Sequence, residues 1–311
     1  MYDVIIIGSG PAGYTAGIYA GRAALKTLLV AGSMNIGGML MNTTLVENYP
    51  GFKDGIQGPD LMQEMLEQTE RFGVEVIYED ALKLDLRGDI KTVVTDEGTH
   101  QGRTVIIATG SGYRTLDVPG EEEHAGHGVS YCATCDGFFF RDQPIMVVGG
   151  GDSAMEEAVF LTHYGSSVTV VHRRDELRAS AAMQAKAFNE EKISFEFDTV
   201  VESINGTDKV ESVTLRNVKT GETKTVPVGG IFIAAGHLPR TELVRDQLQL
   251  DSQGNIWVDS PSTRTSMPGV FAAGDVTDAI YRQAVTSAAS GCRAAIDADR
   301  YIKDQDAQIH L

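Results

Sequence analysis

Short runs of β-branched and aliphatic residues that end in glycine recur along the chain and predict buried parallel strands. The first such run covers residues 3–8. Small residues at 10–24 then favour a tightly packed helix, and 26–31 is a second predicted strand. The same order of strand, helix and strand returns at 144–150, 153–164 and 167–172. Each set predicts one βαβ unit.

A second repeated feature supports an internal duplication. Residues 105–110 close a strand into a glycine turn downstream of the first βαβ unit, and residues 231–236 do the same downstream of the second. Self-similarity of this kind is typical of a duplicated architecture. The chain is therefore expected to contain two nucleotide-binding folds.

Strand-rich stretches accompany both units. Hydrophobic and polar residues alternate over 74–94 in the first half and over 193–228 in the second. Within the second stretch, Asn205-Gly206 and Thr220-Gly221 predict hairpin turns. These stretches enlarge each half beyond the minimal βαβ unit.

The C-terminal part carries a strand at 269–275 and a helix at 281–302, without a glycine-rich motif of the earlier kind. We expect it to complete the first domain, so that the second domain is an insertion with crossings near 113–120 and 237–243. The predicted fold is α/β, with two Rossmann-like (βαβ, three-layer) domains. The domain boundaries follow from the crossings: 1–115 with 244–311 for the first domain, and 116–243 for the second.

Composition narrows the function without changing the fold. The 311 residues include 43 acidic and 26 basic side chains, a formal charge of −17, which argues against nucleic acid and anionic membranes as partners. No apolar run approaches the ~18 residues of a membrane span. The first predicted strand begins at residue 3, which leaves no room for a leader, and three cysteines are too few for a secreted disulfide framework. The expected location is the cytoplasm.

The first strand–helix junction holds a complete dinucleotide-binding fingerprint, Gly8-Ser9-Gly10-Pro11-Ala12-Gly13. Its first glycine makes the tight turn, its second lets the backbone approach a pyrophosphate, and its third lets the helix pack on the sheet. The helix N-terminus adds amide donors. A glycine-rich turn without a ligand is the plainer alternative. The strand that follows ends in Val30-Ala31-Gly32, so the acid that usually binds the ribose is missing.

The second junction carries the related fingerprint Gly149-Gly150-Gly151-Asp152-Ser153-Ala154. The next strand ends in His172-Arg173-Arg174, with Arg178 one helical turn further on. Cations at this position suit the 2′-phosphate of NADPH, because guanidinium groups match phosphate geometry. A solvated basic face is the alternative. We therefore expect NADPH rather than NADH in this domain.

Cys132 and Cys135 are separated by two residues and precede the second fingerprint, a spacing that suits a readily reduced disulfide. Together with His124 and His127 they could instead bind zinc, and a purely structural disulfide is a further alternative. Cys292 has the surroundings of a buried small apolar residue. Asp136 is the candidate proton donor for a leaving thiolate, or a helix-capping residue. The rings of Phe138-Phe139-Phe140 belong to the core or seal the site from water.

These motifs together resemble one family, the low-molecular-weight bacterial thioredoxin reductases, which use NADPH and FAD. The resemblance covers nearly the whole chain. It rests on Gly8 to Gly13, Gly37-Gly38 through Glu47-Asn48-Tyr49-Pro50-Gly51, Cys132-Ala133-Thr134-Cys135-Asp136, Gly149 to Ala158, His172-Arg173-Arg174 with Arg178-Ala179, Gly236-His237 with Pro239, and Gly274-Asp275 with Tyr281-Arg282-Gln283-Ala284.

The resemblance implies a set of site residues in each domain. Asn48 is expected near the flavin, Asp275 on the ribitol, and Arg282 with its successors closing over the cofactor. The expected FAD contacts are Gly8, Ser9, Gly10, Pro11, Ala12, Gly13, Gly38, Met39, Asn48, Ala108, Thr109, Gly110, Gly274, Asp275, Arg282, Gln283 and Ala284. The expected contacts in the NADPH domain are Gly151, Asp152, Ser153, His172, Arg173, Arg174, Arg178 and Gly236. No residue is assigned to a metal.

The resemblance also implies a reaction, in which electrons pass from NADPH through FAD to the Cys132–Cys135 disulfide and on to thioredoxin. Cys135 would face the flavin, Cys132 would attack the disulfide of thioredoxin, and Asp136 would protonate the departing thiolate. A homodimer is expected by the same analogy. The order of the sites along the chain further predicts that the two domains rotate between two arrangements.

Three other functions remain open at this stage: an FAD-dependent dithiol oxidase, a reductase of another dithiol carrier such as a peroxiredoxin system, and a non-enzymatic redox sensor. Two positions depart from the family pattern. Met39 stands where many relatives have glutamine, and Tyr131 stands before Cys132 where a smaller residue is common. The first removes a side-chain amide from the FAD site. The second could alter partner docking.

Overall fold

The computed structural model describes residues 1–34, 36–43 and 45–309, and the chain divides into two compact units. The first unit is Met1–Gly112 with Leu238–Leu311, and the second is Tyr113–His237. The second unit is thus an insertion in the first. Both boundaries lie earlier than the expected 115/116 and 243/244, because residues 113–115 group with the inserted unit and 238–243 with the host.

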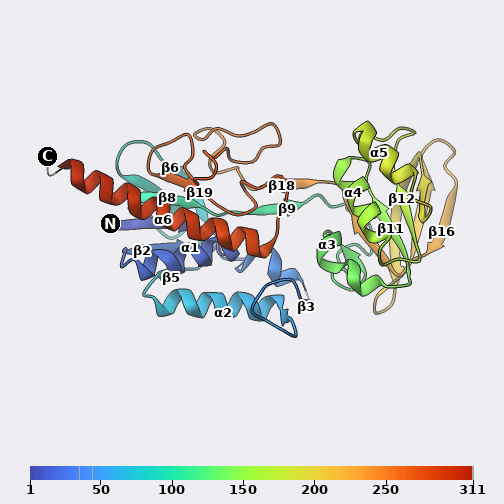
Figure 1. The fold of residues 1–311 in the computed structure, drawn as a ribbon, viewed down its shortest axis with the longest axis horizontal. Coiled ribbons are helices and arrows are strands. Elements are labelled where there is room, and N and C mark those ends of the chain that lie inside the picture. The colour runs from blue at the N-terminus through green and yellow to red at the C-terminus, as the bar shows by residue number, and fades with distance from the viewer. Residues whose placement is uncertain (35, 44, 310–311) are drawn as a thin grey trace. The chain divides into compact units, whose positions relative to one another are not determined.

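The first unit is built on a seven-stranded sheet (Figure 1). Its strands run in the order β5-β2-β1-β8-β7-β6, with β19 also pairing with β8. The pairs among β1, β2, β5, β8 and β19 are parallel, and β6 and β7 are antiparallel additions. The strands are β1 Tyr2–Ile7, β2 Thr27–Val30, β5 Glu75–Ile77, β6 Ala81–Asp85, β7 Lys91–Thr95, β8 Thr99–Ile107 and β19 Val270–Ala272.

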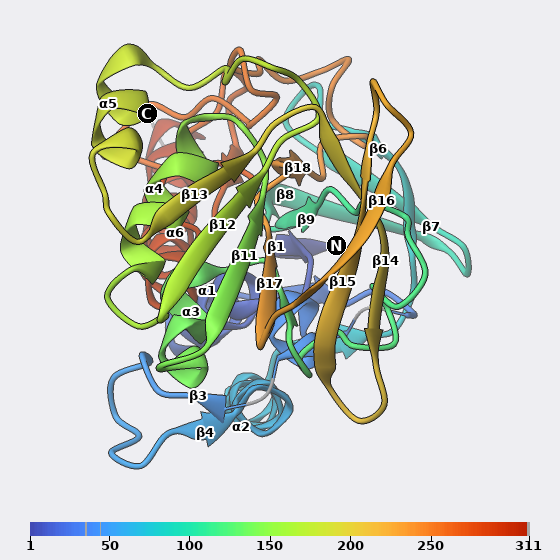
Figure 2. The ribbon, with the colours of Figure 1, turned by 90° about the vertical axis from the view of Figure 1, so that its right-hand side faces the viewer.

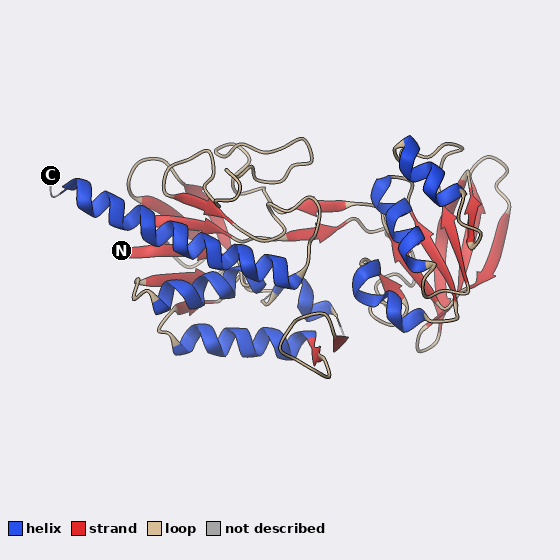
Figure 3. Ribbon diagram, in the orientation of Figure 1, coloured by secondary structure: helices blue, strands red, loops and turns tan. Residues whose placement is uncertain are grey.

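Alternating residues of β1 face two different cores, which is why its last four residues, 4–7, are all apolar. Val4 and Ile6 pack in the cluster that includes the helices α1 (Pro11–Arg22), α2 (Gly58–Arg71) and α6 (Ala284–Ile309). Ile5 and Ile7 pack on the opposite face, with residues of β6, β7 and 244–258. Figure 3 shows the helices gathered on one side of this sheet. The smaller elements are the 3-10 turn η1 Gly38–Asn42 and the strands β3 Leu45–Val46 and β4 Ile56–Gln57.

The second unit holds a five-stranded parallel sheet in the order β10-β17-β11-β12-β13 (Figure 2). A separate antiparallel sheet, β14-β15-β16, packs on one of its faces, and the helices pack on the other. The strands are β10 Val129–Ser130, β11 Pro144–Val148, β12 Ser167–Val171, β13 Ile193–Glu196, β14 Thr199–Gly206, β15 Val210–Asn217, β16 Thr223–Pro227 and β17 Gly230–Ile233. The helical elements are α3 Ala133–Asp136, η2 Gly137–Phe140, α4 Asp152–Leu161 and α5 Ala181–Phe188.

The predicted α/β class with two parallel-sheet domains is confirmed, and one local prediction is wrong. Asn205 and Gly206 do not form a hairpin turn: they are the last residues of β14, at an irregularity in its pairing with β15. The bend comes after them, at residues 207–209. The second predicted turn is present, because residues 218–222 connect β15 to β16 around Gly221 with φ +76°.

The C-terminal helix starts later and ends later than the predicted 281–302. Asp278 accepts hydrogen bonds from the backbone N–H groups of Ile280, Tyr281 and Arg282, which holds this segment in a turn. Arg282 has φ +50°, so α6 can begin only after it. The helix then continues to Ile309. Over the described residues, no helix is both long and apolar enough to cross a membrane.

The two chain crossings between the units pair with each other. The strand β9 (Ser111–Tyr113) leads into the inserted unit, β18 (His237–Pro239) leads out of it, and together they form a two-stranded sheet. Flanking backbone hydrogen bonds run from Arg114 N to Gly236 O at 2.9 Å and from Arg240 N to Gly110 O at 3.0 Å. The insertion is therefore attached by one short ribbon.

Candidate functional site

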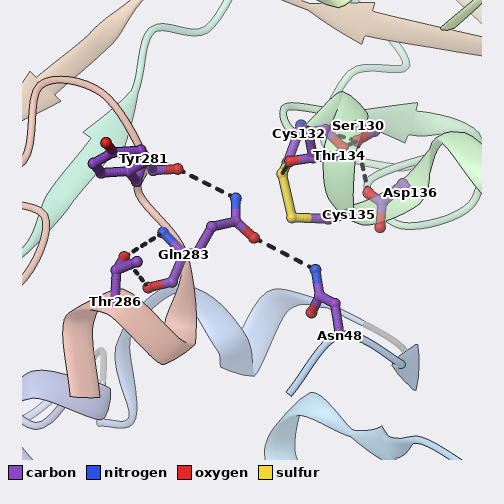
Figure 4. The surroundings of a disulfide bond; sticks show 9 residues. All are labelled: Asn48, Ser130, Cys132, Thr134, Cys135, Asp136, Tyr281, Gln283 and Thr286. Carbon is purple, nitrogen blue, oxygen red and sulfur yellow. Dashed lines mark hydrogen bonds between the residues drawn. A yellow bond between two sulfur atoms is a disulfide. The ribbon is translucent and has the colours of Figure 1, made fainter. Parts of the chain in front are cut away.

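The two cysteines of the inserted unit form a disulfide at the start of α3. Their Cα atoms lie 5.3 Å apart, within the normal range for a disulfide. The carbonyl of Cys132 accepts hydrogen bonds from the N–H groups of Cys135 (3.2 Å) and Asp136 (3.1 Å), so the helical turn itself brings the two sulfurs together. Figure 4 shows the bond and its neighbours Ser130 and Thr134.

Asp136 lies beside this disulfide and is partly buried. Its Oδ2 accepts a hydrogen bond of 2.6 Å from Ser130 Oγ (Figure 4). Burial raises the pKa of the Asp136 carboxyl above its ordinary value, and the Ser130 hydrogen bond opposes this rise. A carboxyl group of this kind keeps its proton closer to neutral pH than an exposed aspartate does, which is the property a proton donor needs.

The structure decides between the alternatives for these residues. The Asp136 side chain makes no capping hydrogen bond to a helix N-terminus, so the capping interpretation is wrong. The two sulfurs are bonded to each other rather than arranged as metal ligands, and His127 Nδ1 faces the Ala125 carbonyl at 3.2 Å. Among the described residues, no three His, Cys, Asp or Glu side chains gather as a metal site.

The first fingerprint has the geometry of a dinucleotide-binding turn between β1 and α1. Gly8 has φ +112°, and a β-carbon there would lie 2.3 Å from the Ala108 carbonyl oxygen. A β-carbon at Gly13 would lie 1.9 Å from the Gly8 carbonyl oxygen, so the helix packs directly on the turn. Gly10 differs, because a β-carbon there would meet nothing within 4 Å. Only Gly10 therefore faces the open space that a pyrophosphate needs.

The other residues of this turn have structural partners. The Ser9 hydroxyl is buried, donates to Ala31 O at 2.8 Å and accepts from Gly37 N at 3.0 Å, so it cannot also bind a phosphate. Pro11 is the first residue of α1 and has no N–H to offer. Ala12 packs closely on Gly274, where a β-carbon would lie 2.9 Å from its own. The Ser9 hydroxyl is therefore committed to the fold, and the predicted cofactor contact of Ser9 would fall to its backbone.

A second glycine turn lies against the open side of the first. Gly37 and Gly38 have φ of +90° and +69°, and a β-carbon at Gly38 would lie 3.5 Å from Gly10 Cα. Met39 follows in η1. Two segments far apart in the sequence thus place glycines side by side.

Asn48 and Gln283 lie in hydrogen-bond contact although they come from distant parts of the first unit. Asn48 Nδ2 donates to Gln283 Oε1 at 3.4 Å, and Gln283 Nε2 donates to Tyr281 O at 3.3 Å (Figure 4). Gln283 and Thr286 form the N-terminal cap of α6, and Ala284 is its first residue. The structure therefore brings together these residues that the sequence assigned to one cofactor.

Two polar side chains near the N-terminal end of α6, Asp275 and Arg282, are partly buried without full compensation by hydrogen bonds or opposite charges. Asp275 Oδ1 accepts from Ser287 Oγ at 2.7 Å, and burial raises the pKa of its carboxyl. The Nε of Arg282 is buried and has no hydrogen-bond partner among the described residues, while its Nη2 donates to Ala279 O. Buried polar groups are normally paired, so an orphaned donor here points to a ligand atom.

The residues after β8 contribute mainly backbone. Ala108 presses its carbonyl on Gly8, and the Thr109 hydroxyl donates to Arg240 O at 2.7 Å. A β-carbon at Gly110 would meet nothing within 4 Å, so the position is open, although its φ of +69° favours glycine. The Thr109 hydroxyl is thus committed to the crossing, and the predicted cofactor contact of Thr109 would fall to its backbone.

The second fingerprint repeats the first in atomic detail. A β-carbon at Gly149 would lie 2.6 Å from the Ala234 carbonyl oxygen, as Gly8 meets Ala108. Gly151, like Gly10, would meet nothing within 4 Å. Each is the N-cap of its helix with extended backbone. The equivalent open position therefore falls on Gly151.

The Asp152 side chain has hydrogen-bond partners within the fold, whereas the Ser153 side chain is exposed to solvent. Asp152 Oδ1 accepts from the N–H and the hydroxyl of Ser180, both at 2.8 Å, and these bonds lower the pKa of its carboxyl. Asp152 therefore anchors the loop before α5 through this oxygen. Ser153 is exposed on the first turn of α4. The Gly236 carbonyl accepts a hydrogen bond from the Arg114 N–H at the crossing.

His172 is buried under the second fingerprint, where its ring would clash with a β-carbon at Gly150. Burial lowers the pKa of its imidazole; a hydrogen bond with the Glu176 backbone opposes this shift, and the charges of the three neighbouring arginines add to it. Its Nε2 has no hydrogen-bond partner among the described residues. A neutral, buried ring suits support of the glycine loop better than a direct ion pair with a phosphate.

Arg173, Arg174 and Arg178 are exposed, and none forms an ion pair within 4.0 Å with a described residue. The backbone N–H of Arg178 donates to Gly150 O at 2.7 Å, which ties this loop to the fingerprint. In a chain with 43 acidic and 26 basic residues, three neighbouring cations without acidic partners are unusual. They are available to a bound phosphate.

One residue of the first unit was missed by sequence reasoning. Asp80 follows β5, and its carboxylate accepts from Ser33 N at 3.0 Å and from Ser33 Oγ, just after β2. An acid therefore does stand at the end of β2, where ribose hydroxyls are usually bound. No local signal could have revealed it, because it comes from a neighbouring strand and not from β2 itself.

Comparison with known proteins agrees with this geometry. The model of the pyridine nucleotide-disulphide oxidoreductase family matches residues 2–291. The chain belongs to this family. Curated relatives include a thioredoxin reductase of Streptomyces clavuligerus, 59% identical over 96% of this chain and 94% of the relative, and one of Mycolicibacterium smegmatis, 57% identical over 98% of both. The expected resemblance is thereby confirmed.

Solved structures give the same result. The thioredoxin reductase of Streptococcus pyogenes is 48% identical, covers 98% of this chain and 99% of its own, and superposes with a TM-score of 0.93. That of Lactococcus lactis, in a state named the FR conformation, is 47% identical over 98% of this chain and 100% of its own, with a TM-score of 0.66. The two relatives have nearly equal identity and coverage, but their TM-scores against this chain differ.

The glycine geometry predicts opposite effects for two neighbouring substitutions. Gly10→Ala adds a methyl group where there is space and where the backbone is extended, so the flavin-free protein should keep its free energy of unfolding. Retention of bound flavin should fall at least tenfold. Gly13→Ala forces a β-carbon onto the Gly8 carbonyl and should cost about 1–3 kcal/mol or more. Urea unfolding and flavin absorbance measure the two effects, and equal loss of flavin without loss of stability in both would contradict the assignment.

The raised pKa of Asp136 predicts a conflict between stability and activity. A folded-state pKa above the unfolded value means that stability is lost as pH rises through the folded pKa. Asp136→Asn removes this loss, so its melting temperature should exceed that of the parent at pH 8 but match it near pH 4. Turnover should fall on the order of a hundredfold. Ser130→Ala, which removes the bond that stabilises the carboxylate, should move the alkaline limb of the pH–rate profile upward; a downward shift would refute the proton-donor role.

Proposed function

We propose that the chain is an NADPH-dependent thioredoxin-disulfide reductase that binds FAD in its first unit and NADPH in its second. The observation that carries this proposal is the Cys132–Cys135 disulfide next to a partly buried carboxyl on the same unit as a dinucleotide fingerprint. The disulfide is a redox centre, the carboxyl supplies a proton, and the fingerprint implies a source of electrons.

The residues present fit both nucleotides. In the first unit, the open positions at Gly10 and Gly38 suit a pyrophosphate, and the unpaired Arg282 Nε and the protonatable Asp275 suit polar atoms of a flavin chain. In the second, Gly151 is open, and the three exposed arginines lie on the segment after β12. When bound, the two groups supply hydride transfer toward the disulfide.

The chain's own chemistry is thiol–disulfide exchange. The thiolate of reduced Cys132 attacks one sulfur of the thioredoxin disulfide, which forms a mixed disulfide and releases a thiolate. Asp136 donates its proton toward the departing thiolate. Cys135 then attacks Cys132, which restores the intramolecular disulfide and frees the second thiol of thioredoxin. Exchange in this order reduces one disulfide of thioredoxin to two thiols and oxidises the two thiols of this protein to a disulfide.

The exposed arginines support NADPH over NADH. A 2′-phosphate would add about two negative charges next to Arg173, Arg174 and Arg178, which lack acidic partners among the described residues. His172 would hold the glycine loop from below rather than bind the phosphate. The same cluster disfavours the dithiol oxidase alternative, which needs no such site.

The location of the sites on the two units supports a rotation between two arrangements as part of catalysis. The redox disulfide and the second fingerprint share the inserted unit, whereas the first fingerprint lies on the host. The ribbon of β9 and β18 is the attachment between them. Two relatives of equal identity that differ in TM-score support the idea that this family changes conformation as a whole. A homodimer and a cytoplasmic location complete the proposal by analogy with the family.

Purified protein tests the function directly. The parent should reduce thioredoxin with NADPH, and Cys132→Ser should abolish this activity while NADPH still bleaches the flavin under anaerobic conditions. Loss of bleaching in the variant would contradict the separate roles given to the disulfide and the nucleotide sites. Bleaching of the parent by small dithiols but not by NADPH would favour the oxidase instead. Substitution of a peroxiredoxin-type carrier for thioredoxin tests the remaining alternative.

Nucleotide preference tests the arginine cluster. Replacing Arg173 and Arg174 by alanine should raise KM for NADPH on the order of a hundredfold, because two charge-assisted contacts to the 2′-phosphate are lost. KM for NADH should change by less than about threefold. Arg216→Ala, which removes a cation of the same unit that is paired with Glu202, serves as the control. Equal losses for both nucleotides would remove the assignment.

A further inference from the structure

Tyr131, the residue directly before Cys132, is held by two contacts inside the second unit. Its ring stacks on that of Tyr113, with centroids 4.8 Å apart and planes 13° from parallel. Its hydroxyl donates to Glu121 Oε1 at 2.8 Å. Neither contact involves the disulfide itself. Both fix the chain immediately on the N-terminal side of the nucleophilic cysteine.

The Glu121 end of this arrangement is rigid. Its carboxylate is buried and accepts hydrogen bonds from the Leu116 N–H, at 3.0 Å to each oxygen, and from the Val118 N–H at 3.4 Å. These donors follow closely after the first crossing. The carboxylate thus ties the phenol of Tyr131 to the backbone that has just entered the unit.

The Tyr113 end belongs to the crossings themselves. Tyr113 is the last residue of β9, and its other neighbour is His237, the first residue of β18, with ring centroids 4.9 Å apart. The backbone bond from Arg114 N to Gly236 O closes the same ribbon. The rings of His237, Tyr113 and Tyr131 therefore run from the exit of the unit, across its entrance, to the redox motif.

The redox side of Tyr131 is equally constrained. The Cys132 N–H donates to Ser130 Oγ at 3.1 Å, and the same hydroxyl donates to Asp136 at 2.6 Å. The Cys132 carbonyl accepts two bonds from α3. A change of torsion at β9 that moves Tyr113 must therefore either break the stack or displace the backbone at Cys132.

We propose that Tyr131 is a positioning residue for Cys132, which links the conformation of the two crossing strands to the redox disulfide through the Tyr113–Tyr131 stack. The proposal rests on the proposed thioredoxin reductase function and adds to it a part that this chain builds from tyrosines at positions 113 and 131. Because the link acts through geometry, it should govern the rate of exchange at Cys132 rather than the affinity for thioredoxin.

A purely structural role is the competing explanation, since Tyr131 also packs against the apolar cluster of Leu116 and Val118. The two explanations differ in which quantity changes. Rings that only fill space lower the free energy of unfolding and leave the rate of exchange at Cys132 unchanged, and because contacting rings are coupled in stability, the cycle is read in that rate. A single mechanical link is broken by the loss of either ring, so the second loss costs nothing more.

The test is a double-mutant cycle in the flavin-loaded full chain. Tyr113→Ala and Tyr131→Ala should each lower kcat for thioredoxin roughly three- to tenfold, with KM within about twofold, and the double variant should match the singles. The rate of Cys132 alkylation by iodoacetamide in the reduced protein should change by the same factor. NADPH-dependent ferricyanide reduction, which bypasses the disulfide, should stay at the parental rate.

Three controls separate the outcomes. Tyr113→Phe and Tyr131→Phe keep the stack and should stay within about twofold of the parent. Phe197→Ala removes a ring from the Phe195–Phe197 stack of the same unit and should leave kcat unchanged. Additive losses, a change confined to KM, or an equal loss in Phe197→Ala would overturn the proposal. A parent that reduces ferricyanide but no thioredoxin would defeat the proposed function instead, and the alkylation cycle would still test the link.

Discussion

The contact between a glycine turn and the carbonyl that ends a neighbouring strand is the constraint on which both halves of the molecule depend. Gly8 meets the carbonyl of Ala108, and Gly149 meets that of Ala234, each closer than any β-carbon could lie. This approach pulls the helix N-terminus onto the sheet edge and leaves Gly10 and Gly151 facing open space. The same steric rule, applied twice, therefore creates two nucleotide sites. A side chain at either close-contact glycine would separate helix from sheet and remove the site with the fold.

Burial of the Asp136 carboxyl beside the disulfide favours its protonated form but lowers the stability of the fold when the carboxyl ionises. Asp136 is kept from water, so its proton is held more tightly, and Ser130 limits how far this goes. A similar tension exists at Asp275, whose burial is offset by Ser287. Both carboxyls accept a hydrogen bond from a serine hydroxyl. Buried acids with a perturbed pKa are common at functional sites.

Sequence patterns could predict the two sheets, the fingerprints and the disulfide, because these depend on local periodicity and on glycine spacing. Such patterns could not reveal which side chains were already engaged. Ser9, Asp152 and Thr109 carry suitable groups, yet the fold commits them to Ala31, Ser180 and Arg240. Asp80 escaped notice for the converse reason, since it reaches the end of β2 from another strand. The predicted turn at Asn205-Gly206 is misplaced because two residues alone do not indicate where the pairing of β14 with β15 becomes irregular. A sequence pattern does not show which side chains already have hydrogen-bond partners from distant parts of the chain.

The paired strands β9 and β18 give the insertion neighbouring ends. An inserted segment whose two ends lie close together can be accommodated without breaking hydrogen bonds between the strands of the host sheet. The host strand β8 and the later β19 still pair with each other although the whole second unit lies between them in the chain. The two units can thus diverge in composition and loop length as separate proteins would, provided that the backbone pairing of β9 with β18 is kept.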